Sequence, residues 1–322
     1  MKTTTRMAAA AAVVLLMALA VGLTGAAGKP AATQLTEVKI GVFPAADYAP
    51  LFVGLKRGIF KKAGLDIKVQ YAFTGSALMA AITSGATDLA TNSDLGGITG
   101  IANGLPVKIV TQTSFTPTKG YLEVLVRGDS SIKNFGDLAG KTVATINLQG
   151  QFHLLVANAV EKAGGDPNSI HAVPMSPNDE PAALAAGRVD AIVMQDPTLT
   201  QAKSKYPTFR SLGNPVRLLG YKLPSAAYYS SDSTISKKAA VLRKFSVAYK
   251  EAAAIATRNQ PLARQTVLKY TGIDNATAVK VTLPEFTTSL TPKDLGPVLL
   301  QMKRYGFLKT IPSFSQIYWN GK

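Results

Sequence analysis

A short repeat within the chain constrains its fold more than any other feature of the sequence. The segment Ala80–Asp88 recurs as Ala182–Asp190, and Asp94 recurs as Asp196 at the same offset of 102 residues. Each copy has the pattern of a helix, a glycine that ends it, a strand that starts at an aspartate, and a second aspartate just after the strand. The repeat therefore predicts two similar α/β lobes in one chain.

The paired positions of the repeat predict different roles. Gly85 and Gly187 suit the left-handed backbone position that follows a helix. Asp88 and Asp190 begin their strands, and we expect them to be structural, because ligands collect at the opposite, carboxyl ends of parallel strands. The second aspartate of each copy follows a strand, so the two are expected to approach one enclosed volume from opposite lobes.

Strand-like and helix-like segments alternate along the first two thirds of the chain, which is typical of parallel α/β units. Strands are predicted at Glu37–Phe43, Asp66–Tyr71, Asp88–Thr91, Val107–Thr113, Tyr121–Arg127, Thr142–Ile146, Ile170–Pro174 and Asp190–Met194. Helices are predicted at Ala49–Arg57, Ala77–Ser84, Leu95–Asn103, Gln151–Ala163, Glu180–Ala186 and Thr198–Lys205. From Ser236 onward the pattern is almost entirely helical, with candidates at Lys237–Asn259, Leu262–Tyr270, Ala276–Val281 and Pro292–Tyr305.

Composition excludes several kinds of chemistry. The 322 residues are 47% hydrophobic and 17% charged, as in a globular chain of about two domains. There is no cysteine, which excludes disulfides, thiolate metal sites and cysteine nucleophiles. The two histidines, His153 and His171, lack the short spacing of hydrolytic zinc sites. We therefore expect no metal site and no cofactor.

The first 27 residues have the pattern of a signal peptide. Lys2 and Arg6 form a basic start, Ala8–Leu23 is apolar or small, and Thr24–Ala27 supplies small residues for cleavage. The apolar run is too short and too rich in alanine for a membrane span. Residues 1–27 are thus expected to be removed, which leaves a soluble, monomeric protein in the periplasm.

The chain is basic, with 35 Lys and Arg against 19 Asp and Glu and a net charge of +16. These basic residues are scattered over segments with the pattern of helix surfaces, for example Lys56–Lys62 and Lys237–Lys244. They indicate a solvated basic surface, and we do not expect a nucleic-acid partner.

Several segments resemble, in their order along the chain, the solute-binding proteins of the nitrate/sulfonate/taurine group, to which thiamine-pyrimidine synthases are similar. These segments are Val38–Val42, Tyr48–Leu51, Gly58–Phe60, Gly64–Ile67, Phe73–Ser76, Ser84–Ala90, Asp137–Ala144, Ala186–Ala191 and Gly306–Leu308. The resemblance implies a type 2 periplasmic binding protein fold, in which two α/β lobes are joined by two crossing strands. It also implies a small-molecule solute and a partnership with an ABC permease and its ATPase.

The resemblance further implies where the lobes and the ligand site lie. The chain would cross first near Tyr121–Arg127 and return near Pro224–Tyr229, which gives lobe one as 37–120 plus 224–322 and lobe two as 121–223. The ligand positions that it implies are Asp47, Tyr48, Thr74, Gly75, Ser76, Asn92, Ser93, Asp94, Ser114, Phe115, Gln149, Gly150, Gln151, Gln195 and Asp196.

The ligand class stays open at this point. Taurine- and sulfonate-binding relatives tend to have Ser/Thr clusters at the lobe-two helix start, where this chain has Gln149–Phe152. Backbone N–H groups at the starts of two helices could hold an anion, whereas Asp47, Asp94 and Asp196 would disfavour a bare oxyanion unless they serve as helix N-caps. A sulfonate, a pyrimidine or other heterocycle, and an amine-bearing solute are all compatible. Tyr48, Phe115, Tyr121 and Phe152 could stack on a ring or belong to the core.

An enzyme is the weaker alternative. Gly140-Lys141-Thr142 leads into a predicted strand and lacks the remainder of a phosphate loop, and no Gly-x-Ser-x-Gly elbow is present. The thiamine-pyrimidine synthases depend on a cysteine-rich motif, and this chain has no cysteine. A third possibility is a protein that presents its ligand to a membrane sensor.

Overall fold

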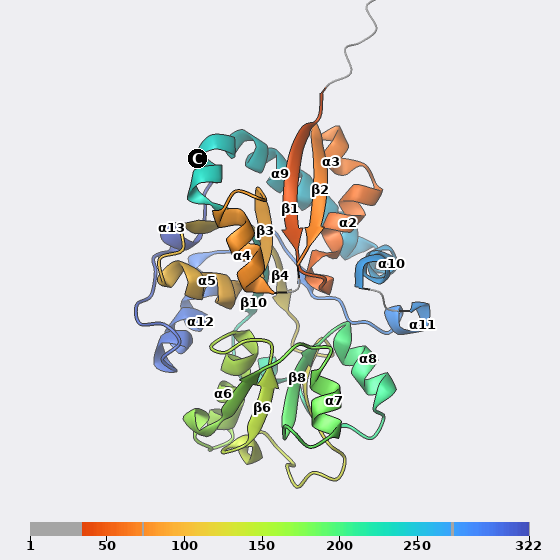
Figure 1. The fold of residues 1–322 in the computed structure, drawn as a ribbon, viewed down its shortest axis with the longest axis vertical. Coiled ribbons are helices and arrows are strands. Elements are labelled where there is room, and N and C mark those ends of the chain that lie inside the picture. The colour runs from red at the N-terminus through yellow and green to blue at the C-terminus, as the bar shows by residue number, and fades with distance from the viewer. Residues whose placement is uncertain (1–33, 73, 272–273, 322) are drawn as a thin grey trace, which may run out of the picture. The chain divides into compact units, whose positions relative to one another are not determined.

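Two β-sheets organise the computed structural model, which describes residues 34–72, 74–271 and 274–321 (Figure 1). The expected signal peptide, residues 1–27, lies outside the described residues. The described residues from Leu35 onward belong to one compact unit.

The first sheet has six strands in the order β11-β4-β10-β3-β1-β2. Within it, β1 runs parallel to β2 and β3, whereas β10 is antiparallel to both β3 and β4. The strands are β1 (Thr36–Val42), β2 (Leu65–Tyr71), β3 (Leu89–Ser93), β4 (Val107–Thr116), β10 (Leu223–Ser231) and β11 (Glu285–Phe286).

The second sheet has five strands in the order β7-β6-β8-β5-β9. Here β6 is parallel to β7 and β8, and β5 is antiparallel to β8 and β9. The strands are β5 (Leu122–Val126), β6 (Thr142–Thr145), β7 (His171–Pro174), β8 (Ala191–Gln195) and β9 (Arg210–Gly213). Since each sheet has its own helices, the chain forms two α/β lobes, and the predicted fold class is confirmed.

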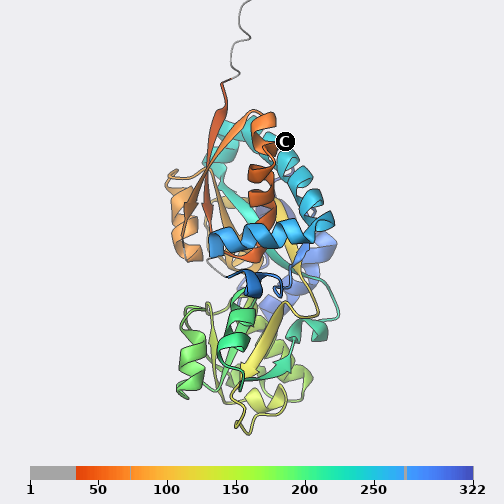
Figure 2. The same cartoon turned by 90° about the vertical axis from the view of Figure 1, so that its right-hand side faces the viewer.

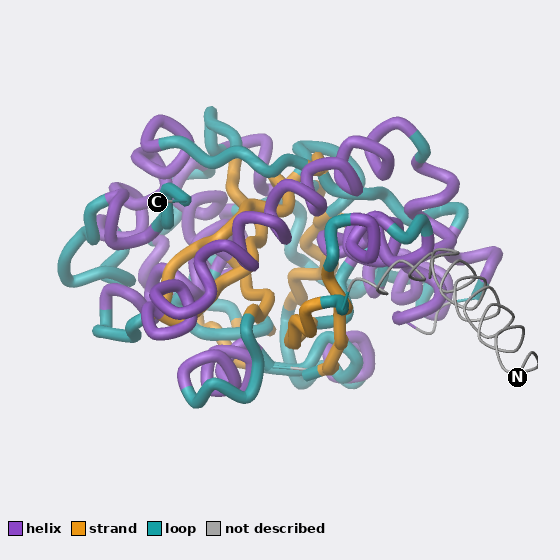
Figure 3. The backbone as a smooth tube through the Cα atoms, turned by 90° about the horizontal axis from the view of Figure 1, so that it is seen from above, coloured by secondary structure: helices purple, strands orange, loops and turns teal. Residues whose placement is uncertain are grey.

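Helices surround both sheets (Figure 3). Figure 2 shows α2, α9 and α10 grouped on one face of the first sheet, whereas α6, α7 and α8 cover the second sheet. The helices are α2 (Ala49–Lys56), α3 (Ile59–Lys62), α4 (Gly75–Thr83), α5 (Asp94–Ala102), α6 (Gln151–Lys162), α7 (Glu180–Ala185), α8 (Thr198–Lys205), α9 (Asp232–Arg258), α10 (Gln260–Thr271), α11 (Asn275–Ala278), α12 (Pro292–Arg304) and α13 (Phe314–Ile317).

The predicted equivalence of the two repeat copies is visible in their hydrogen bonds. Asp88 Oδ2 accepts from the backbone N–H of Lys39 at 2.9 Å, and Asp190 Oδ2 accepts from that of Thr142 at 2.8 Å. Each aspartate therefore ties the start of its strand to the neighbouring parallel strand, at the middle of β1 in the first copy and at the start of β6 in the second. The glycine that precedes it has a φ of +78° at position 85 and +70° at position 187, as the left-handed position requires.

The chain connects the two sheets twice. It leaves the first sheet after β4 and enters the second at β5, and it returns between β9 and β10. The return includes a short 3₁₀ helix at Pro215–Leu218. Residues 117–121 and 214–222 are therefore the two connections between the lobes.

Candidate functional site

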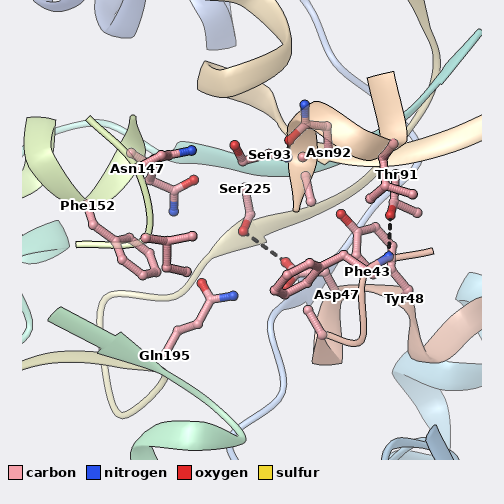
Figure 4. A pocket seen from close by; sticks show the side chains of 16 residues that line it. Phe43, Asp47, Tyr48, Thr91, Asn92, Ser93, Asn147, Phe152, Gln195 and Ser225 are labelled. Atoms are coloured by element: carbon pink, nitrogen blue, oxygen red, sulfur yellow. Dashed lines mark hydrogen bonds between the residues drawn. The ribbon is translucent and has the colours of Figure 1, made fainter. Parts of the chain in front are cut away.

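A cavity of about 90 Å³, here called the inner cavity, is lined by residues of both lobes (Figure 4). Lobe one contributes Phe43, Ala45, Asp47, Tyr48, Gly75, Leu78, Thr91, Asn92, Ser93, Ser225 and Ala226. Lobe two contributes Ile146, Asn147, Gln151, Phe152 and Gln195. Most of these residues follow the carboxyl ends of β1, β3, β6 and β8 or begin the next helix, which is where open α/β sheets bind ligands.

A second cavity of about 440 Å³, the outer cavity, adjoins the inner one. Both are lined by Phe43, Ala45, Ile146, Phe152 and Gln195. The rest of its lining comes almost entirely from lobe two, from the loop after β7 and from the β8–α8 junction. The two cavities therefore adjoin along the wall that these five residues form.

Asp47 is the best-bonded side chain at the inner cavity. Its Oδ1 accepts from the hydroxyls of Ser114 at 2.6 Å and Ser225 at 2.9 Å, and its Oδ2 accepts from Tyr121 Oη at 2.5 Å. Ser114 lies in β4 and Ser225 in β10, and Tyr121 lies in the connection between β4 and β5. Asp47 therefore joins β4 and β10 to the first connection between the lobes.

Asp94 is fully buried and does not line either cavity. Its Oδ2 accepts from Gln112 Nε2 at 2.7 Å, while Oδ1 has no hydrogen-bond partner among the described residues. Burial raises its pKa to about 7, opposed by the Gln112 hydrogen bond and assisted by the charge of Asp47. The N-cap of α5 is Ser93, whose side chain accepts from the Gly96 N–H.

Asp196 lies at the wall of the outer cavity and acts as a cap. Its Oδ1 accepts from the backbone N–H of Thr200 at 3.0 Å and from the Thr200 hydroxyl at 2.6 Å. Its Oδ2 accepts from the Thr282 N–H at 2.6 Å, a bond from lobe two to lobe one. Burial raises the pKa of Asp196, and the Thr200 and Thr282 bonds oppose that rise. Asp94 and Asp196 thus differ from expectation, because they do not face one shared volume.

The inner cavity has hydrogen-bonding capacity that the protein leaves unused. The side-chain amides of Asn147 and Gln195 make no hydrogen bond to another described residue, whereas Gln151 Nε2 donates to Thr116 Oγ1 at 3.0 Å. In Figure 4, Asn147, Phe152 and Gln195 lie on one side of the cavity, opposite the residues of lobe one. These amides offer both donors and acceptors to a bound molecule.

The charged side chains that line the inner and outer cavities are all acidic. None of the residues that line the inner or the outer cavity is a lysine, arginine or histidine, and the only charged side chains there are Asp47 and Asp196. An anion would therefore have to be held by backbone N–H groups and by neutral side-chain donors such as Asn147 and Gln195, close to Asp47. Phe43, Tyr48 and Phe152 add aromatic surface.

The structure separates the sequence-predicted ligand positions into two groups. Those at the inner cavity are Asp47, Tyr48, Gly75, Asn92, Ser93, Gln151 and Gln195. Those outside its lining are Thr74, Ser76, Asp94, Ser114, Phe115, Gln149, Gly150 and Asp196. Several of the second group have local roles, since Thr74 caps α4, Gly150 is the N-cap of α6, and Ser114 bonds Asp47.

Sequence reasoning missed four polar or aromatic residues at the inner cavity. Phe43, Thr91 and Asn147 lie at or just after the ends of strands, so the rule for parallel sheets could have found them. Ser225 comes from the antiparallel β10, for which that rule gives no signal.

The described residues contain no group of three or more His, Asp or Glu side chains placed to hold a metal ion. None of the helices that the structure describes has the length and apolar character needed to cross a bilayer.

Comparisons with known proteins agree with this architecture. The family model described as NMT1/THI5 like matches residues 45–263. The "Putative binding protein YtlA" of Bacillus subtilis (strain 168) is 31% identical over 109 residues. That match spans 34% of this chain and only 32% of the relative.

Solved structures show the same fold at low sequence identity. The periplasmic aliphatic sulphonate binding protein SsuA from Escherichia coli has a TM-score of 0.73 at 19% identity, over 88% of this chain and 92% of that one. The Candida albicans CA3427 gene product, described as having the generic periplasmic binding protein structural fold, has a TM-score of 0.69 at 15% identity, over 88% and 93%. These similarities establish a periplasmic binding protein fold.

Proposed function

Because the chain belongs to the NMT1/THI5-like family and has the periplasmic binding protein fold, we propose that it is the periplasmic substrate-binding component of an ABC importer. It binds one small organic solute between its lobes and delivers it to a membrane permease and its ATPase. The solute contacts include the seven predicted positions at the inner cavity together with Asn147, Phe152 and Ser225.

One observation carries the ligand class, namely that the lining of the inner cavity includes polar side chains but no cationic one. The Asp47 carboxylate already accepts hydrogen bonds from three hydroxyls, so it does not require a cationic solute as a partner. Asn147 and Gln195 can donate to and accept from a neutral amide-like group. The favoured solute therefore carries an uncharged hydrogen-bonding group, with aromatic contacts from Phe43 and Phe152.

A calorimetric comparison of neutral and anionic solutes tests this class. We expect neutral amides and lactams to bind, and a solute at 100 times its Kd to stabilise the fold by about 2.7 kcal/mol. Gln195→Leu should weaken that binding about tenfold, because it removes a hydrogen-bonding partner. Gln70→Leu, at an exposed position on β2, is the matched control and should leave the affinity unchanged. Binding of sulfonates alone would contradict the proposal.

Binding without catalysis gives a separate expectation. The lining of the inner cavity offers no nucleophile paired with a histidine or lysine base. A bound solute should be recovered chemically unchanged after long incubation with stoichiometric protein, as followed by mass spectrometry. Conversion in proportion to the protein, and lost in Gln195→Leu, would instead support an enzyme of the synthase type.

Export provides a further test of the importer role. The mature protein in a periplasmic extract should begin close to Gly28, because residues 1–27 have the pattern of a signal peptide. Intact-mass analysis measures this directly. Retention of Met1 on most of the exported protein would contradict processing.

A further inference from the structure

Two asparagines line the inner cavity from opposite lobes, and each lies against a glycine at the start of a helix (Figure 4). In lobe one, Asn92 lies near the end of β3 and against Gly75, the first residue of α4. In lobe two, Asn147 follows β6 and lies against Gly150, the N-cap of α6. The two lobes therefore present an amide to the cavity in the same way.

Each glycine provides the space that its asparagine occupies. A Cβ atom added at Gly150 would overlap Asn147 Oδ1 and lie 2.6 Å from Asn147 Cγ. A Cβ atom added at Gly75 would lie 2.7 Å from Asn92 Oδ1 and 3.3 Å from Asn92 Nδ2. Neither position requires glycine for its backbone, since Gly150 has a φ of −94° and Gly75 is not among the residues with positive φ. Both glycines are therefore needed for the room beside the amide.

The contacts also indicate which end of each amide is left for a bound molecule. Asn92 Oδ1 accepts from the backbone N–H of Ser93 at 2.9 Å, which identifies the oxygen. In Asn147 the oxygen is again the amide atom nearest to the glycine, at the start of a helix whose N–H groups receive no side-chain cap. Neither amide nitrogen donates to another residue in the described part of the chain. Two N–H donors, one from each lobe, thus remain for the solute.

From these contacts we propose that the amide nitrogens of Asn92 and Asn147 donate hydrogen bonds to the solute, and that Gly75 and Gly150 are positioning residues for these amides. The inference rests on the proposed function. It adds that the solute presents acceptor atoms, such as carbonyl oxygens, to both lobes. A methyl group at either glycine displaces the amide without straining the backbone, so each glycine acts on binding only through its asparagine.

Calorimetry with butyrolactam, a neutral lactam, tests the link between glycine and asparagine. Asn147→Ala should weaken binding about tenfold, because it removes one hydrogen bond. Gly150→Ala should weaken it by the same factor, and the double variant should be no weaker than either single variant, since both changes remove one contact. Unchanged affinity in Gly150→Ala, or losses that multiply in the double variant, would overturn the positioning role. Gly75→Ala paired with Asn92→Ala gives the same test for lobe one.

Two further variants test the direction of the hydrogen bond and the effect of an added methyl group. Asn147→Asp keeps the size of the side chain but replaces the N–H donor by an acceptor, so it should lose at least as much affinity as Asn147→Ala. Unchanged affinity in Asn147→Asp would show that the oxygen contacts the solute, against the proposal. Gly296→Ala in α12 is the matched control, because its added Cβ meets no atom within 4 Å, and it should bind as the wild type does. Thermal melting of each variant reports its folding.

A measurement without ligand separates this inference from the proposed function. The side-chain amide resonances of Asn147 in the NMR spectrum of the free protein should shift in Gly150→Ala and stay in place in Gly296→Ala. Resonances that Gly150→Ala leaves unchanged would overturn the inference whatever the protein binds. If butyrolactam fails to bind the wild type and methanesulfonate binds instead, the ligand class of the proposed function falls. The same variants titrated with methanesulfonate then decide whether the two asparagines donate to its oxygens.

Discussion

Asp47→Ala should destabilise the protein by about 3–5 kcal/mol, measured by urea unfolding at neutral pH. The substitution leaves the buried hydroxyls of Ser114, Tyr121 and Ser225 without the carboxylate that accepts from all of them. A buried donor that loses its acceptor keeps the cost of desolvation without the gain of a hydrogen bond. The loss is large because three such donors depend on one side chain.

Tyr121→Phe is the matched control for Asp47. It keeps the buried ring and removes one of the three donors, so it should cost about 1–2 kcal/mol. The double variant should be more stable than the sum of the two single losses predicts, because both remove the same bond. Stability of Asp47→Ala within 1 kcal/mol of the wild type would contradict the role of this network.

Because of Asp94, the free energy of unfolding should decrease as the pH rises from about 4 to about 7. A pKa of about 7 in the folded state, against 3.8 for an exposed aspartate, means that the folded state keeps a proton that the unfolded state has lost. Stability that is fully present below pH 4 is therefore lost as the pH rises through 7, by roughly 4 kcal/mol in total. Denaturant titrations at successive pH values measure this slope.

Asp94→Asn removes that slope and serves as the test. The amide can still accept from Gln112 but does not titrate, so the variant should match the wild type near pH 4 and exceed its stability at pH 8. Glu180 is the control, since it is also fully buried and burial raises its pKa. In a Glu180→Gln background the Asp94 slope should persist. A slope unchanged by Asp94→Asn would show that other groups cause it.

The repeat and the alternation of the sequence predicted the fold well, because both depend on local patterns. Thr198–Lys205 was predicted at the bounds of α8, and the glycines at 85 and 187 have the expected backbone. By contrast, the sequence of β10 does not alternate between polar and apolar residues. The strand lies between two other strands and all of its residues are buried, so neither of its faces is exposed to solvent. Only the family resemblance indicated a strand there. The short strands β9 and β11 gave no usable pattern.

The candidate site was harder to predict than the fold. The strand before Asp94 was predicted to end at Thr91 but continues to Ser93. That difference makes Ser93 the cap and puts Asp94 inside the first turn of α5, where it is buried away from the cavities. A small change of boundary thus moves a side chain from a ligand surface to the interior. Asn147 and Ser225 depend on tertiary contacts that no local pattern encodes.

The bonds of Asp47 also bear on how the lobes could move. The side chain holds β4, β10 and the first connection together at the place where the chain passes between the lobes. A rigid rotation of lobe two about this point displaces each residue in proportion to its distance from the point. Because Asp47 also lines the inner cavity, one side chain belongs both to the junction of the lobes and to the wall of the cavity.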